Sequence, residues 1–172
     1  MDLIKFIDDS FIKNPSSYQY SDWAVRIAAR GVIINDQKNI ALMHIKKYSI
    51  YKLPGGGVET HEEIHEALER EVKEETGLET EMIAPIGIVI EKREEQKLFQ
   101  VSYCFLLKYK SKGETSLTEK EVEEGFELYW AKDIDDAISI IKLSENKEED
   151  NVYIRLRETD ILLKAKEKLA NY

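Results

Sequence analysis

The sequence has one cysteine, three prolines and no long apolar run. A single cysteine excludes an internal disulfide, and Cys104 lies in the apolar stretch VSYCFLL, where we expect a buried thiol rather than a nucleophile. No apolar run approaches the roughly 20 residues needed to cross a bilayer. The first residues, MDLIKFIDDS, carry acids where a signal peptide has positive charge. We therefore expect a cytoplasmic protein with no membrane partner.

Basic residues are also in short supply. The chain has 25 Lys and Arg against 34 Asp and Glu, which gives a net charge of −9. A protein that binds a nucleic-acid polymer neutralises phosphates with Lys and Arg, so this balance argues against such a partner. A small phosphorylated ligand remains compatible with the charge, provided that divalent cations lie between its phosphates and the carboxylates of the protein.

The pattern of apolar residues predicts an α/β fold. A chain of 172 residues with 42% hydrophobic residues is long enough for one packed domain. Residues 1–22 read as an N-terminal extension, a short helix or strand followed by a polar linker, and residues 23–172 as the domain. Within the domain, two hairpins (24–34 with 39–45, and 83–91 with 98–109), a last strand (126–130) and helices over 61–76, after Asp133 and over 150–169 are expected. Strands and helices in this order favour a mixed sheet covered by helices on both faces.

The helix over residues 61–76 follows a loop of three glycines. A capping box of Thr60 and Glu63 sets its expected start, and Gly77 its expected end. On a helical wheel, Ile64, Leu68 and their apolar neighbours form one stripe. Two acidic residues lie inside this stripe, each about 20° from Ile64: Glu71 and Glu75.

Glu74 lies beside Glu71 on the same wheel, so three carboxylates are spaced i, i+3, i+4 and repel one another. Because two of them face the core, an unpaired charge would be costly there. Arg70 lies on the flank and is placed to border the cluster rather than to neutralise it alone. Hard divalent cations prefer carboxylate and carbonyl oxygens, so the spacing predicts a metal site. By contrast, Glu66 and Glu69 lie on the solvated face.

These residues also follow a known spacing. Five residues separate Gly56 from Glu62, and seven separate Glu62 from the run REVKEETGL at 70–78. The pattern resembles the Nudix box of the Nudix (MutT-like) hydrolases, with every fixed position filled. The resemblance implies a Nudix-type α/β/α sandwich with a mixed β-sheet. It also implies hydrolysis of a nucleoside diphosphate linked to another group X, or of a nucleoside triphosphate.

The resemblance assigns metal ligands. Glu71, Glu74 and Glu75 would bind Mg²⁺, with Mn²⁺ as an alternative ion. A backbone carbonyl from the glycine stretch, that of Gly55 or Gly56, would join them, since glycine permits a close approach of the backbone. Bound cations would screen the diphosphate from the acidic protein and stabilise charge that develops at phosphorus while water attacks.

The resemblance also assigns supporting roles. Glu74 would act as, or assist, the base, Arg70 would position it, and Glu62 would pair with Arg70 or support the site through water. Many members add an acid from a loop before the last strand. The expected loop TEKEVEEG offers Glu124 as first choice, although solvated loop acids are common and this alternative stays open.

Substrate recognition is less clearly encoded. Arg26 and Arg30 lie on one face of a strand and could meet phosphates, while a surface ion pair explains them equally well. Aromatic side chains could stack on a base, although at strand spacing such residues more often belong to the core. The residues concerned are Tyr48, Tyr51, Phe99 and Tyr103.

Two other function classes are less compatible with the sequence. A catalytically silent Nudix-fold module would sense a nucleotide without cleaving it, but such modules usually lose a box acid and none is missing here. An RNA-processing enzyme is disfavoured by the charge of −9. No GK[ST] follows the glycines, so this is not a Walker A loop. The expected partner is a small nucleotide substrate, and a homodimer is left open.

Overall fold

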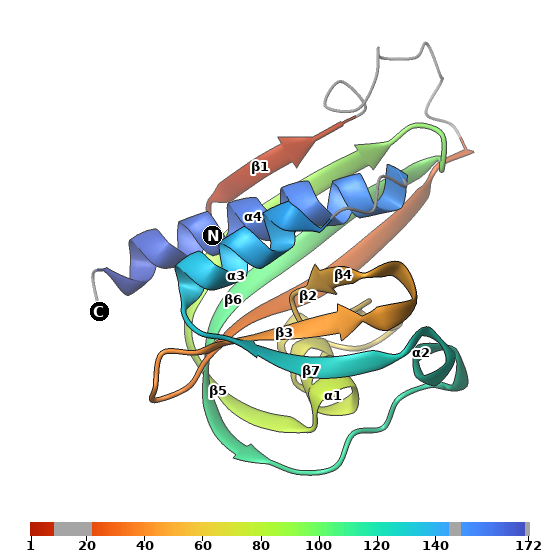
Figure 1. The fold of residues 1–172 in the computed structure, drawn as a ribbon. Helices are drawn as coiled ribbons and strands as arrows, with labels where there is room; N and C mark the ends of the chain where they lie inside the picture. Colours follow the sequence, from red (N-terminus) through yellow and green to blue (C-terminus); the bar gives the residue numbers. More distant parts are fainter. Residues whose placement is uncertain (9–21, 145–148, 171–172) are drawn as a thin grey trace.

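The computed structural model describes residues 1–8, 22–144 and 149–170, and within these residues seven strands form one mixed sheet (Figure 1). The strands run in the order β1-β5-β6-β2-β3-β4, and β7 pairs with β3. Their bounds are β1 Leu3–Ile7, β2 Ala24–Ile34, β3 Ile40–Ile45, β4 Ile50–Lys52, β5 Leu78–Arg93, β6 Leu98–Lys112 and β7 Phe126–Ala131.

Helices cover both faces of this sheet. They are α1 Ile64–Thr76, α2 Glu119–Glu124, α3 Ile134–Leu143 and α4 Glu149–Leu169, with a short 3₁₀ turn η3 at Lys46–Tyr48. Figure 1 shows α3 and α4 side by side across one face, while α1 lies behind the sheet. The predicted α/β/α sandwich with a mixed sheet is confirmed.

Alternating side chains of the central strands supply two separate cores. Val32 packs toward the face covered by α3 and α4, together with the buried Tyr153 of α4. The next residue, Ile33, packs toward α1, where it joins Leu68 and Val72. Because consecutive side chains of a strand point to opposite faces, the continuous apolar runs of these strands bury both faces of the sheet. A rigid sheet therefore lies between α1 and α4.

The first predicted hairpin is only partly formed. The turn after β2 is present, but β2 and β3 pair only at Ile34 and Ile40. Over its whole length, β2 instead pairs in parallel with β6, from Ala24 opposite Leu98 to Ile34 opposite Lys108. Beyond the turn, β3 leaves β2 and takes β7 and β4 as antiparallel partners. The second predicted hairpin, β5 with β6, is confirmed.

The helix after the glycines begins three residues later than predicted. His61 has a left-handed φ of 70°, which an α-helix cannot contain, so the chain enters α1 only after Glu63. The capping box is formed by Glu63 and Glu66 instead of Thr60 and Glu63. Gly77 ends the helix with a φ of 69°, as predicted. The acidic stretch before the last strand differs from the prediction of a loop, because it forms the short helix α2.

At the N-terminus, β1 joins the sheet in parallel with β5. The polar linker expected after it, NPSSYQYSD at 14–22, lies outside the described residues except for its last residue. Cys104 is fully buried, as predicted, and burial raises the pKa of its thiol. No described helix combines the length and the apolar character needed to cross a membrane.

Candidate active site

The glycine loop lies along β2. Gly31 N donates to Pro54 O at 3.0 Å, and Ala29 N donates to Gly56 O at 3.0 Å. Gly55 has a φ of 127°, and a Cβ at this position would lie 3.1 Å from the Cα of Arg30. Only glycine fits such a backbone so close to a strand. The loop is therefore held against the strand that carries both predicted substrate-binding arginines.

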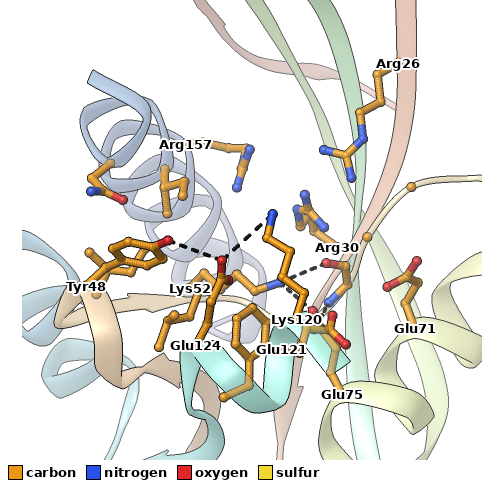
Figure 2. Close-up of a pocket in the computed structure, with 18 of the residues that line it drawn as sticks. Arg26, Arg30, Tyr48, Lys52, Glu71, Glu75, Lys120, Glu121, Glu124 and Arg157 are labelled. Atoms are coloured by element: carbon orange, nitrogen blue, oxygen red, sulfur yellow. Dashed lines mark hydrogen bonds and ion pairs between the residues drawn. The ribbon is translucent and has the colours of Figure 1, made fainter. Parts of the chain in front are cut away.

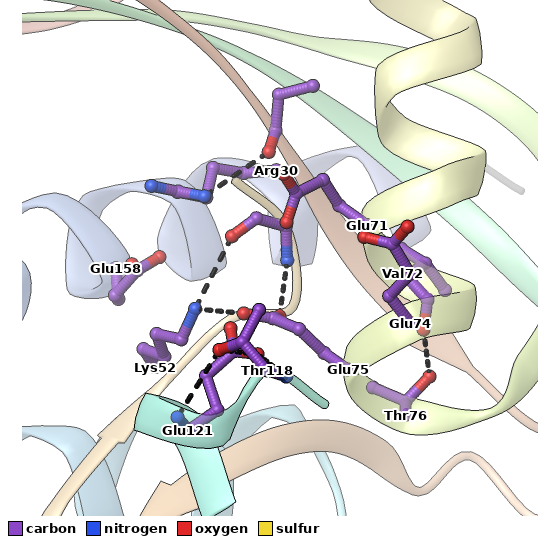
Figure 3. Close-up of polar contacts among 12 residues, drawn as sticks. Arg30, Lys52, Glu71, Val72, Glu74, Glu75, Thr76, Thr118, Glu121 and Glu158 are labelled. Carbon is purple, nitrogen blue, oxygen red and sulfur yellow. Dashed lines mark hydrogen bonds and ion pairs between the residues drawn. The ribbon is translucent and has the colours of Figure 1, made fainter. Parts of the chain in front are cut away.

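Glu71 and Glu75 of α1 reach this loop from the opposite side. The side chain of Glu75 is 4% exposed, and its Oε2 accepts from Gly55 N at 2.9 Å (Figure 3). The Glu71 carboxylate lies directly over Gly56, where any Cβ would collide with it. Both side chains occupy the inward-facing positions that the helical wheel predicts.

Electrostatics distinguish these two carboxylates. Lys52 Nζ contacts Glu75 Oε1 at 2.6 Å and Gly55 O at 3.4 Å, so Glu75 has a cationic partner (Figure 3). For Glu71, burial raises the pKa more than the hydrogen bond from Arg70 lowers it, and the charge of Glu75 raises it further. Glu71 is thus a half-buried carboxylate whose charge is incompletely compensated, as expected of a cation ligand.

Arg70 ties the box residues together, as the resemblance implies. Its Nε and Nη2 donate to the two carboxylate oxygens of Glu62 at 2.8 and 3.0 Å. Its Nη1 donates to Glu71 at 3.0 Å and to Glu74 at 3.1 Å, and Nη2 also reaches Gly57 O at 3.1 Å. The hydrogen bonds from Arg70 hold the pKa of Glu62 at about 2. One guanidinium therefore fixes three carboxylates and the loop.

Glu74 is placed differently from the other two predicted metal ligands. Its side chain is 44% exposed and remains on Arg70, outside the cavity that Glu71 and Glu75 line. Within the described residues, no three His, Cys, Asp or Glu side chains converge closely enough to hold a metal ion. The geometry brings two of the three carboxylates together at the glycine loop and leaves the third on the outer side of α1.

The residues present nevertheless fit a hard divalent cation. Glu71 and Glu75 supply carboxylate oxygens, and the loop between them supplies backbone carbonyls, the donor set that Mg²⁺ prefers. Gly56 leaves room for the Glu71 carboxylate where any side chain would exclude it. Burial and the neighbouring charge of Glu75 raise the pKa of Glu71, and a cation bound beside it would oppose this rise.

A cavity of about 610 Å³ opens between α1, α2, α4 and the sheet (Figure 2). Its volume is in the range of small-molecule sites. Arg26 and Arg30 line it, and so does Glu124, which accepts from Tyr48 Oη at 3.2 Å. The predicted acid of the last loop therefore does reach the cavity, from the end of α2. Of the four aromatic side chains considered for base stacking, only Tyr48 contributes to this lining.

Sequence reasoning missed several lining residues. Lys52 lies two residues after the buried Ile50 on β4. Residues two apart on a strand point to the same face, so this spacing could have placed Lys52 beside Ile50. Lys120 lies in the first turn of α2, which begins at a capping box of Thr118 and Glu121 that is readable in the sequence. Arg157 lies far along α4, and no local pattern places that helix against the cavity.

A family model described as "NUDIX domain" matches residues 25–153 of this chain. The chain belongs to the Nudix family. A putative 8-oxo-dGTP diphosphatase from Bacillus subtilis (strain 168) is 36% identical over 70 residues. This match covers 40% of the chain and 47% of that relative, so it spans about half of the relative's length.

Solved Nudix structures share the fold. A MutT NUDIX hydrolase from Burkholderia pseudomallei superposes with a TM-score of 0.57 at 21% identity, covering 78% of this chain and 98% of that one. The MutT protein from Methanosarcina mazei Go1 gives 0.56 at 20% identity, with 86% and 97% coverage. At these identities the likeness concerns the fold alone, and it agrees with the predicted architecture.

Proposed function

We propose that the protein is a Mg²⁺-dependent Nudix pyrophosphohydrolase. It would cleave the diphosphate linkage of a small nucleoside diphosphate derivative or nucleoside triphosphate by attack of water at phosphorus. One observation carries this proposal: two inward-facing carboxylates, Glu71 and Glu75, meet a glycine loop at a polar cavity whose other wall carries arginines. We assign this activity to residues 23–172.

Glu71 and Glu75, with a carbonyl of Gly55 or Gly56, would hold the cation, and Glu74 would complete the set. A divalent cation bound there would neutralise the diphosphate, lower the pKa of water and stabilise the transition state. Mn²⁺ suits the same oxygen ligands.

The side chains of the protein would then orient substrate and water. Arg70 fixes Glu71 and Glu74 through its Nη1, so the position of the proposed base depends on this arginine. Glu74 would accept the proton of the attacking water, and its exposure leaves it accessible to water. Glu124 lines the cavity and would assist from the opposite side, while Arg26 and Arg30 would bind phosphate oxygens.

A silent module that senses a nucleotide is the alternative. Every fixed position of the box is filled in this chain, and Arg70 holds three of its carboxylates by hydrogen bonds. A binding module has no need for such an arrangement. This observation favours the enzyme.

The test uses Glu74→Gln, with Glu69→Gln as the matched control. Both substitutions remove one charge from α1, but Glu69 lies on the exposed face. Wild type and variants are incubated with Mg²⁺ and nucleoside triphosphates, oxidised triphosphates, ADP-ribose, nucleotide sugars or dinucleoside polyphosphates, and products are identified by chromatography. We expect Glu74→Gln to lower kcat by about 10²–10⁴-fold with an unchanged fold, and Glu69→Gln to match the wild type.

Near wild-type turnover by Glu74→Gln at saturating Mg²⁺ would disprove the role of Glu74. Absence of turnover on every substrate, with tight nucleotide binding, would replace the enzyme with the sensing module.

A further inference from the structure

Arg30 is a buried cation without an adequate partner. Its side chain is 4% exposed, and its Nε has no hydrogen-bond partner among the described residues. The only hydrogen bond it donates there is a long one, from Nη1 to Ala29 O at 3.4 Å. Burial, and next the charge of Arg157, lower the pKa of Arg30 to about 10. A buried charge is costly unless something pairs with it, and Arg30 has no paired carboxylate among the residues that the structure describes.

Arg30 lies among charged side chains of both signs, most of which are already paired with one another. Arg26 and Arg157 extend toward the same cavity (Figure 2). Glu158 and Glu75 are the carboxylates whose charges act on Arg30, but Glu158 already accepts from Arg157 at 2.6 Å and Glu75 from Lys52 at 2.6 Å. Six cationic and four acidic side chains line the whole cavity, and two of the cationic ones, Arg93 and Arg157, are already ion-paired with the buried Glu91. Arg157 is therefore neutralised, whereas no described carboxylate pairs with Arg30.

The glycine loop places this cluster next to the proposed cation site. A Cβ on Gly57 would lie 3.5 Å from Nε of Arg26, whereas Gly56 is covered by Glu71. The loop thus has carboxylates on one side and guanidinium groups on the other. A phosphate chain held by a cation at the carboxylates would extend toward the arginines.

α4 completes the wall behind Arg30. Arg157 is 2% exposed and is fixed to β5 by its ion pair with Glu91, so the helix is anchored at the cavity. Asn151 and Ile154 of the same helix also line the cavity. The family model matches only residues 25–153, and Arg157 lies beyond that match. Of the α4 residues in this wall, Asn151 lies inside the matched range, while Ile154 and Arg157 lie beyond it.

We propose that Arg30, flanked by Arg26 and Arg157, forms a subsite for a phosphate group additional to the diphosphate that is cleaved. The substrates would be nucleotides with a further phosphate, such as a triphosphate or a phosphorylated X, in preference to those with an uncharged X. The identity of the molecule that brings the phosphate rests on the proposed function. The phosphate subsite itself does not, because it requires only Arg30 and its neighbours.

The alternative is that Arg30 has a purely structural role. Glu158 is fully buried, and its Oε2 also lacks a hydrogen-bond partner among the described residues. Arg30 could then serve only as a countercharge to Glu158, for instance through a bridging water. The two readings differ in what removal of the charge does to stability. A countercharge stabilises the free protein, whereas a ligand-binding cation is stabilised only when its anion is bound.

The test compares Arg30→Met with the control Arg155→Met. Arg155 lies two residues before Arg157 on α4, does not line the cavity and donates to Ser144 O. Binding of inorganic phosphate and of pyrophosphate is measured by calorimetry in EDTA, and unfolding midpoints are measured in phosphate-free buffer. We expect Arg30→Met to weaken pyrophosphate binding about tenfold or more, since it removes charge-assisted hydrogen bonds. Its unfolding midpoint should equal or exceed that of the wild type, and Arg155→Met should bind like the wild type.

A second variant, Arg30→Lys, covers the case in which Arg30→Met does not fold. Lysine keeps the charge but loses the guanidinium fork, so weaker pyrophosphate binding with a wild-type midpoint is expected. Wild-type binding by Arg30→Lys or Arg30→Met overturns the subsite. The subsite is also overturned if the wild type does not bind pyrophosphate. It is overturned as well if Arg30→Met has a lowered unfolding midpoint and unchanged pyrophosphate binding.

Kinetics identify the source of the phosphate. With Mg²⁺, Arg30→Met should raise KM for a nucleoside triphosphate more than for a nucleoside diphosphate sugar. An equal increase for both would refute the additional phosphate on the substrate. If neither compound is hydrolysed by the wild type while Arg30→Met still loses pyrophosphate binding, the proposed function fails and the subsite stands.

Discussion

The three consecutive glycines before α1 should respond very differently to the same substitution. At Gly55, alanine must adopt a φ of 127°, and its Cβ would collide with the carbonyl oxygen of Ala29 on β2. The backbone conformation alone costs about 1–3 kcal/mol, and a strand backbone cannot move to relieve the collision. We expect Gly55→Ala to lose several degrees in its unfolding midpoint, together with its activity.

At Gly56, the atoms in the way belong to a side chain. A Cβ there would overlap the Glu71 carboxylate, while φ is not in the left-handed region. The carboxylate can rotate away, which breaks its 3.0 Å hydrogen bond with Arg70 and costs about 1.5–3 kcal/mol. Part of this loss is offset by about 0.4–1 kcal/mol, because alanine has less freedom than glycine in the unfolded chain. Gly56→Ala should therefore fold but should bind the cation about 10–100-fold more weakly.

Gly57 is the internal control. A Cβ there would meet only the Arg26 side chain, at the ordinary distance of 3.5 Å. Gly57→Ala should keep the stability and the cation affinity of the wild type. Mn²⁺ affinity is measured by electron paramagnetic resonance and stability by thermal unfolding. Wild-type Mn²⁺ affinity in a folded Gly56→Ala protein would show that Glu71 is not a cation ligand.

Two further predictions concern stability. Burial opposes ionisation of Glu91, but Arg157 and Arg93 outweigh it and hold the pKa at about 2, below the ordinary 4.5. This lowered pKa contributes about 3 kcal/mol above pH 4.5, and the contribution is lost as the pH falls toward 2. In urea unfolding, Glu91→Gln should thus be less stable than the wild type at neutral pH and nearly equal to it near pH 2, whereas a constant difference would contradict the lowered pKa. Leu68 is 1% exposed, so Leu68→Ala should lose about 2–5 kcal/mol of unfolding free energy, against less than about 0.5 kcal/mol for the exposed Glu69→Ala.

The part of the site that could be predicted from the sequence is local. Glu71 and Glu75 lie one helical turn apart, so a wheel anchored on Ile64 and Leu68 is enough to turn both inward. The end of α1 at Gly77 was equally readable. Its start was not, because the left-handed φ of His61 comes from the path of the loop rather than from the preference of histidine.

What the sequence could not predict depends on contacts between distant segments. A short turn after Ile34 favours a hairpin of β2 with β3. Instead, β2 forms its backbone hydrogen bonds along its length with β6, more than 60 residues away in the sequence. Arg157 reaches the cavity because α4 packs on the sheet through buried residues such as Tyr153 and Leu162, and its pair with Glu91 holds it there. No local pattern carries that information, since side-chain periodicity gives the buried face of a helix but not its partner.

The net negative charge of the chain is compatible with phosphate binding in the cavity, because surface charges act only over a short distance in salt solution. A net charge of −9 acts over the whole surface and disfavours a long polyanion, which would contact many acidic side chains at once. At physiological ionic strength, exposed charges further apart than about 8 Å are largely screened, so a small ligand inside the cavity responds chiefly to the side chains that line it. Arg26 and Arg30 are among these side chains, and Arg30 has no paired carboxylate among the described residues. The charge balance that disfavours a nucleic-acid polymer is therefore compatible with the proposed binding of a compact phosphate compound in the cavity.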